Sequence, residues 1–238
     1  IQNGLSNDFF IDRLKKSKFK LTCDYFFCIT ELEKKIFEKN ISSKFIVIGS
    51  FLNNFFFKEE KKKKELLLIS QFRDKKDILE FQKYYYLTLK FLIPNLIKLT
   101  LKKNITLSIL GSSYSYQKEI NYYKKLFGNY HFNFYKRKGY MSYKRLAQSN
   151  IIIGYDSTLL FEAFARNKKV GIVNFSPIKK NLHETNSFFT KFYFKENGKF
   201  WIKKMDKTKL NFVLNFLLSS SNEEWKKTTK PYKGLFIL

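Results

Sequence analysis

Short apolar stretches alternate along the chain with longer segments whose apolar positions recur at helical spacing. Most of the short stretches are continuous and end at Gly or Ser, which is typical of strands buried on both faces of a parallel sheet. We expect strands at residues 26–29, 45–48, 66–70, 105–110, 131–135, 151–154 and 170–175. This alternation of strands with helices predicts an α/β fold with a parallel sheet.

The helical segments carry recognisable start and stop signals. Thr30 can cap a short helix over residues 30–40, Gly128 ends a helix over 116–127, and Pro94 predicts a kink or a division into two helices within 77–103. Further helices are expected at residues 142–149, 157–167 and 207–219. A charged stretch that includes Lys61–Lys64 lies between two apolar segments, so we place a domain boundary near residues 55–65.

The five strands after this boundary can form one doubly wound sheet. Right-handed crossovers and the commonest strand order place the strands in the order 131–135, 105–110, 66–70, 151–154, 170–175. The chain reverses direction between strands 66–70 and 151–154, and ligands of such sheets bind outside the carboxyl ends of strands at that point. The turns at 71–73 and 155–158 should therefore face each other across one crevice.

A polar turn opens the helix that follows strand 151–154. Asp156, Ser157 and Thr158 stand where backbone N–H groups and the helix dipole favour an anion, most often a phosphate. Alternatively, one of these three side chains only caps the helix. Glu162 follows about one turn later among apolar and small residues, where a buried carboxylate needs a partner such as a ribose diol. The alternative for Glu162 is an exposed carboxylate near the helix start.

Other candidates belong to neighbouring turns. Arg73 can pair with a pyrophosphate through its planar guanidinium, or it can be an ordinary surface residue. Ser112 and Ser113 follow strand 105–110 and either line the crevice or form an ordinary turn. Residues 136–139 flank a nucleotide base or form a solvated loop, and His183 with Glu184 lies in a region without a clear pattern.

The remaining residues with reactive side chains are expected to have no role in the site. His131 begins a strand and is expected to be structural. Cys23 and Cys28 are five positions apart, on opposite faces of an extended strand, and we expect both to be reduced, buried and inert. The sequence has no P-loop, no dinucleotide fingerprint and no zinc pattern, so we expect neither a metal nor a cofactor.

The segment IIIGYDSTLLFEAFARNKKVGIVNF resembles the nucleotide-binding strand–turn–helix–strand of GT-B glycosyltransferases. It is also similar to the same segment of non-hydrolysing UDP-N-acetylglucosamine 2-epimerases and of wall-polymer glycerophosphotransferases. Together with ISQFR and LSILGSS, it resembles bacterial surface-carbohydrate biosynthesis proteins of this fold. The resemblance implies that Ser157 and Thr158 contact the phosphates of a nucleotide-sugar and that Glu162 contacts its ribose, with the donor as substrate and no separate cofactor.

Two departures from the family patterns make retaining glycosyl transfer and epimerisation less expected activities. Gly154 stands where many retaining GT-B enzymes carry a second Glu, and Thr158-Leu159 replaces the Gly-Gly of the epimerase pattern.

The resemblance implies a GT-B-like chain truncated at its amino end. Residues 1–55 would end an acceptor-side α/β domain, 56–65 would be a linker, and 66–238 would be a Rossmann-like nucleotide-sugar domain. Most of the acceptor site, and the usual catalytic base, would then belong to the missing part, which leaves enzymatic activity of this chain open.

Composition excludes several other classes. The 238 residues are 44% hydrophobic and 19% aromatic, which excludes intrinsic disorder, and no apolar run is long enough to span a membrane.

Lys and Arg total 46 against 20 Asp and Glu, a net charge of +26. The Lys residues are scattered, and Lys, Asn, Ile, Phe and Tyr can all be encoded by A and T alone, so compositional bias explains much of this charge. We expect a soluble cytoplasmic protein that attaches peripherally to the inner membrane face, near a lipid-linked acceptor, with no specific nucleic-acid partner. The alternatives are a non-catalytic GT-B relative and a polyanion-binding module.

Overall fold

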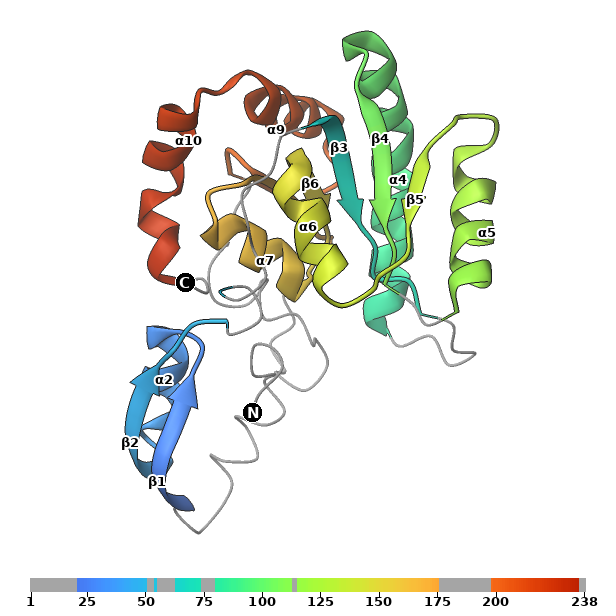
Figure 1. Cartoon of the computed structure of the whole chain (residues 1–238). Coiled ribbons are helices and arrows are strands. Elements are labelled where there is room, and N and C mark those ends of the chain that lie inside the picture. Colours follow the sequence, from blue (N-terminus) through green and yellow to red (C-terminus); the bar gives the residue numbers. More distant parts are fainter. Residues whose placement is uncertain are drawn as a thin grey trace.

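Two parallel sheets organise the chain in the computed structural model, which describes residues 21–50, 54, 63–73, 80–112, 115–175 and 198–235. The first sheet has two strands and the second has six (Figure 1). The charged stretch where we expected a linker lies largely outside the described residues, although the second sheet already begins at Lys63.

The larger sheet has the strand order predicted from the sequence, with one strand added at its edge. Its order is β5-β4-β3-β6-β7-β8, and every pairing is parallel. The reversal falls between β3 and β6, as predicted. The strands are β3 (Lys63–Ile69), β4 (Thr106–Leu110), β5 (Asn133–Tyr135), β6 (Ser149–Gly154), β7 (Lys169–Val173) and β8 (Trp201–Ile202).

Helices cover both faces of this sheet. In Figure 1, α4 lies behind the sheet, whereas α6 and α7 lie in front of it. This placement follows from right-handed crossovers that run in opposite directions from the reversal. The helices are α4 (Glu80–Lys103), α5 (Tyr116–Phe127), α6 (Tyr140–Gln148), α7 (Thr158–Ala165), α9 (Lys207–Ser219) and α10 (Asn222–Thr229), followed by the 3₁₀ helix η2 (Lys230–Leu235).

Local sequence signals explain where several helices begin, end or continue. Gly128 adopts φ 57° directly after α5, a conformation that costs Gly little, and ends that helix as predicted. Asp206 and Ser221 cap α9 and α10 by accepting hydrogen bonds from backbone N–H groups three residues later. Pro94 lies inside α4, which is one helix and not two. The helix continues because Leu92, Ile93 and Leu96 are buried in the core on both sides of the proline.

The smaller unit consists of β1 (Leu21–Cys28), α2 (Glu31–Phe37) and β2 (Ile41–Val47). Thr30 caps α2 by accepting from the N–H of Glu33 at 3.1 Å, as predicted. The expectation that both cysteines are buried is wrong for Cys23, which is exposed, whereas Cys28 is fully buried. Cys23 lies at the register irregularity of β1 between Thr22 and Tyr25, where its thiol donates to Ser43 Oγ at 3.4 Å, whereas Cys28 belongs to the small core beneath α2.

A buried carboxylate joins four strands at the amino ends of the large sheet. Glu65 on β3 is 3% exposed and accepts hydrogen bonds from Ser108 on β4, Tyr135 on β5 (3.2 Å) and Ser149 on β6 (3.1 Å). Three hydroxyl donors compensate for the removal of this group from water.

Candidate functional site

The two turns at the reversal of the sheet are in direct contact. The backbone N–H of Asp156 donates to Oε1 of Gln71 at 2.9 Å, and the Gln71 side-chain amide donates back to the Asp156 carbonyl. Gln71 follows β3 and Asp156 follows β6 (Figure 1). The prediction that these turns face one another at the carboxyl ends of the strands is therefore confirmed.

A buried network of hydroxyl groups supports the turn after β3. The N–H of Gln71 donates to the Tyr85 hydroxyl at 2.9 Å, and that hydroxyl lies 2.7 Å from the hydroxyl of Tyr123. Tyr123 donates to Ser70 Oγ at 2.8 Å, which in turn accepts from the N–H of Phe72 at 3.1 Å. Burial raises the pKa of Tyr85 to about 12 and that of Tyr123 well above its usual value, so both phenols stay protonated.

The turn after β4 joins the same cluster. Ser112 donates from its hydroxyl to the carbonyl of Phe72 at 2.7 Å, and its backbone N–H donates to the buried carboxylate of Glu119 at 2.9 Å. Ser112 thus borders the turn at 71–73, while Ser113 lies outside the described residues. Arg73 is exposed, and its carbonyl accepts from the Tyr86 hydroxyl at 3.3 Å.

Helix α7 begins at the same edge, and the side chain of its N-cap residue does not cap it. Ser157 occupies the N-cap position with φ −112° and ψ 137°, but its side chain makes no capping hydrogen bond. The backbone carbonyl of Ser157 accepts from the N–H of Leu160 at 2.8 Å. Ser157 and Thr158 are both partly exposed. The alternative in which the Ser157 hydroxyl serves as the cap is therefore not the observed arrangement.

Glu162 lies inside the protein on α7, with 4% of its surface exposed. The alternative of an exposed carboxylate is wrong because the neighbouring positions of α7 are all buried. The Ser50 hydroxyl donates to Oε1 of Glu162, and the Tyr143 hydroxyl also forms a hydrogen bond with this carboxylate. Burial raises the pKa of Glu162, and the two hydroxyls and the charge of Arg137 oppose that shift.

The sequence interpretation missed several of these partners. Ser50 comes from the segment after β2, and Tyr143 comes from α6. Neither residue belongs to a pattern that indicates a ligand, and Ser50 is 112 positions away from Glu162 along the chain. Arg137 belongs to the loop considered for a nucleotide base, and the structure places its charge near Glu162.

Among the remaining candidates that the structure describes, His131 does not join this cluster. His131 is exposed ahead of β5, and His183 with Glu184 lies outside the described residues. Among the residues that the structure describes, no group of His, Cys, Asp and Glu could hold a metal ion. Within the same residues, no helix is long and apolar enough to cross a bilayer.

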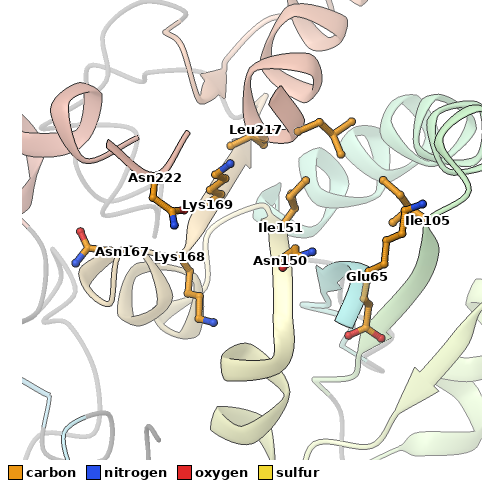
Figure 2. A pocket seen from close by; sticks show the side chains of 11 residues that line it. Glu65, Ile105, Asn150, Ile151, Asn167, Lys168, Lys169, Leu217 and Asn222 are labelled. Carbon is orange, nitrogen blue, oxygen red and sulfur yellow. The ribbon is translucent and has the colours of Figure 1, made fainter. Parts of the chain in front are cut away.

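A cavity of about 330 Å³ lies at the opposite edge of the sheet, at the amino ends of β3, β6 and β7 (Figure 2). Its lysines support the fold, since Lys168 donates to the carbonyl of Ala147 and Lys169 to that of Ser220, near the ends of α6 and α9. Glu65 also lines the cavity and is held by its three hydroxyl donors. This cavity is therefore separate from the site at the reversal of the sheet.

Solved structures share the fold of this chain. A "putative UDP-N-acetylglucosamine 2-epimerase" from Listeria monocytogenes superposes with a TM-score of 0.54 and 12% identity, covering 90% of this chain and 56% of that one. The UDP-GlcNAc 2-epimerase of Methanocaldococcus jannaschii, solved with UDP-GlcNAc and UDP, gives a TM-score of 0.50 at 12% identity, covering 87% and 60%. The chain thus spans less than two thirds of either structure.

The fold and the switch-point site define a GT-B-like α/β protein, as the resemblance implied. Within that class, the chain belongs to the family described as "putative O-antigen biosynthesis protein", which matches residues 1–234. No curated protein is significantly similar to the sequence. The family confirms that this is a protein of surface-carbohydrate biosynthesis.

Proposed function

We propose that the carboxyl-terminal sheet binds the nucleoside diphosphate part of a nucleotide-sugar, and that the protein takes part in transferring the sugar to a surface polysaccharide. One observation carries this proposal. At the reversal of the sheet, α7 combines an N-cap serine whose side chain makes no capping hydrogen bond with a buried carboxylate one turn later. In a protein of O-antigen biosynthesis, an anion site beside a carboxylate suits a phosphate beside a ribose.

Each candidate residue has a role in this proposal. Ser157 and Thr158 would donate hydroxyl hydrogen bonds to the diphosphate, at the positive end of the α7 dipole. Glu162 would accept hydrogen bonds from the ribose diol. Arg73 is exposed at the turn after β3 and would pair with the pyrophosphate as a bidentate donor. Ser112 and Ser113 would border the same crevice from the turn after β4.

Transfer fits this chain better than epimerisation does. The M. jannaschii epimerase was solved with UDP-GlcNAc and UDP, which supports a nucleotide-sugar as the ligand class. This chain, however, carries Thr158-Leu159 where the epimerase pattern has Gly-Gly. A side chain at either position changes how closely a ligand can approach the backbone of α7. We therefore favour glycosyl transfer, with the acceptor groups supplied by an amino-terminal domain.

The acceptor would be lipid-linked and presented at the cytoplasmic face of the membrane. The net charge of +26 favours reversible attachment to anionic headgroups. Such attachment would bring the donor site close to a growing saccharide without a membrane-spanning segment.

Removing the Glu162 carboxylate tests the donor site. Glu162→Ala should weaken UDP binding at least about tenfold in calorimetry, because charged hydrogen bonds contribute roughly 1.5–3 kcal/mol each. Glu162→Gln keeps the side-chain volume and an acceptor oxygen for Ser50 and Tyr143, so it separates a binding defect from misfolding. Glu223→Ala, an exposed position in the first turn of α10, is the matched control and should leave affinity unchanged. Wild-type UDP affinity in Glu162→Ala would overturn the proposal.

A further inference from the structure

Two residues that follow β2 are hydrogen-bonded to helix α7 at the same sequence separation. Ser50 donates to Glu162, and Asn54 accepts from Nη2 of Arg166 at 3.0 Å. Both pairs are 112 positions apart along the chain. The N–H of Asn54 donates to the carbonyl of Ser50 at 2.9 Å, so the two residues span one helical turn. We call Ser50 and Asn54 the latch.

The latch closes access to the carboxylate on which the donor site depends. Glu162 is 4% exposed, and the two residues bound to it, Ser50 and Tyr143, are 7% and 6% exposed. A ribose can reach this carboxylate only if one of them moves away.

Ser50 is the partner that can leave. Tyr143 belongs to α6, and its ring is part of the main hydrophobic core, so moving it would expose apolar surface. Ser50 lies on a connecting segment between the two sheets, and its small side chain adds little to the core. Exchanging a serine hydroxyl for a ribose hydroxyl also preserves the number of hydrogen bonds made by the carboxylate.

We infer that the Ser50 hydroxyl occupies the ribose position on Glu162, and that a nucleoside diphosphate must open the latch in order to bind. This inference rests on the proposed donor site. Opening costs the contacts of Ser50 and Asn54 with α7, so the latch lowers the affinity of the closed protein for the nucleotide. The ligand, in turn, shifts Ser50 and Asn54 away from α7.

The movement is local and does not separate the two units. Ile48, just before the latch, remains hydrogen-bonded to Cys28, with its N–H 2.9 Å from the Cys28 carbonyl. Ile29 of the small unit belongs to the main hydrophobic core. Ser50 and Asn54 therefore move while these anchors hold the small unit in place.

Two substitutions in the latch test this inference by UDP titration of the full chain. Ser50→Ala removes the competing hydroxyl and should tighten UDP binding about tenfold, the factor expected for one hydrogen bond to a charged group. Asn54→Ala removes the contact with Arg166, together with the hydrogen bond from the Asn54 amide to the Ile48 carbonyl at 3.5 Å, and should tighten binding by a smaller factor. Ser43→Ala, on β2 of the same unit, is the matched control and should bind UDP like wild type.

Amide exchange of the wild-type protein provides a readout that does not depend on the variants folding. The Asn54 N–H, which is bonded to Ser50 in the closed latch, should exchange faster when UDP is added. If UDP binds but Ser50→Ala binds no tighter and Asn54 keeps its protection, the latch is refuted while the donor site stands. If wild type and both latch variants bind neither UDP nor ADP nor GDP, the proposed function fails and the latch fails with it.

Discussion

Gln71 and Asp156 are joined by both hydrogen-bonding groups of one side-chain amide, which contacts the backbone N–H and the carbonyl of Asp156. The two residues belong to turns that follow adjacent parallel strands. Because Asp156 directly precedes the N-cap of α7, this pairing fixes where the helix begins relative to β3. The Tyr85 hydroxyl, bonded to the N–H of Gln71, fixes the other side of the same turn.

Gln71→Leu should destabilise the protein by about 1–3 kcal/mol, since it leaves a partly buried N–H and carbonyl without their partners. The side-chain volume changes little, so the effect reports the lost hydrogen bonds. Urea denaturation followed by circular dichroism measures the change. Gln117→Leu, at an exposed position of α5, is the control and should have little effect. Equal unfolding free energies for Gln71→Leu and wild type would show that the pairing does not hold the turns together.

Ser157 and Ser221 occupy the same helix position, but only Ser221 caps its helix, accepting from the N–H of Glu224 at 3.0 Å. Ser221→Ala should therefore lower the unfolding free energy by about 1 kcal/mol, whereas Ser157→Ala should leave it nearly unchanged. The order should reverse in UDP titrations, where Ser157→Ala weakens binding and Ser221→Ala does not. Uridine, which has no phosphate, should be less affected by Ser157→Ala. A stability loss in Ser157→Ala as large as that in Ser221→Ala would contradict this division of roles.

The raised pKa of Glu162 makes stability depend on pH. The folded protein holds the proton more tightly than the unfolded chain, in which the pKa of the carboxyl is near its ordinary value of 4.5. The resulting stabilisation is fully present below that value and is lost as pH rises through the folded pKa. Tyr143, Ser50 and Arg137 reduce this loss by favouring the charged form. Glu162→Gln lacks the titration, so its stability relative to wild type should increase as pH rises from about 4 to about 8. A difference that does not vary with pH, measured by urea denaturation, would contradict the shift.

Membrane attachment, if it is electrostatic, should follow lipid charge and salt. Lysines close to an anionic surface contribute about 1 kcal/mol each, so the protein should co-sediment with anionic vesicles and not with neutral ones. Salt at about 0.5 M should abolish binding because the Debye length then falls to roughly 4 Å. Equal binding to neutral vesicles, or binding that survives this salt concentration, would exclude peripheral attachment by charge.

The architecture of the large sheet was predictable because its signals are local and repeated. Continuous apolar strands, Gly128 after α5 and the handedness of crossovers together specified the order from β5 to β7. The prediction omitted β8 and α10. Strand β8 has only two residues, too few for a hydrophobic pattern, and α10 buries mainly Trp225 and Thr229. These edge elements depend on contacts with the rest of the fold more than on their own sequence.

The candidate site was predictable in its location but not in its internal contacts. The apolar residues around Glu162 correctly indicated a buried carboxylate that needs partners. The observed partners, Ser50 and Tyr143, come from distant elements and are common residue types without a motif. The pairing of Gln71 with Asp156 could not be predicted from the sequence either, because a glutamine before a loop belongs to no characteristic pattern. Such contacts arise only when the strands are assembled.

The carboxylate of Glu65 has a consequence for how the parallel strands align during folding. Its donors Ser108, Ser149 and Tyr135 come from β4, β6 and β5, and each reaches it in the native register. If one strand slipped by a single residue, its side chains would turn to the other face and one donor would be lost. Strands rich in Leu and Ile tolerate many alignments almost equally well, whereas an ionisable group cut off from water does not. Glu65 thus favours one register of the four strands over other registers that would bury the apolar side chains equally well.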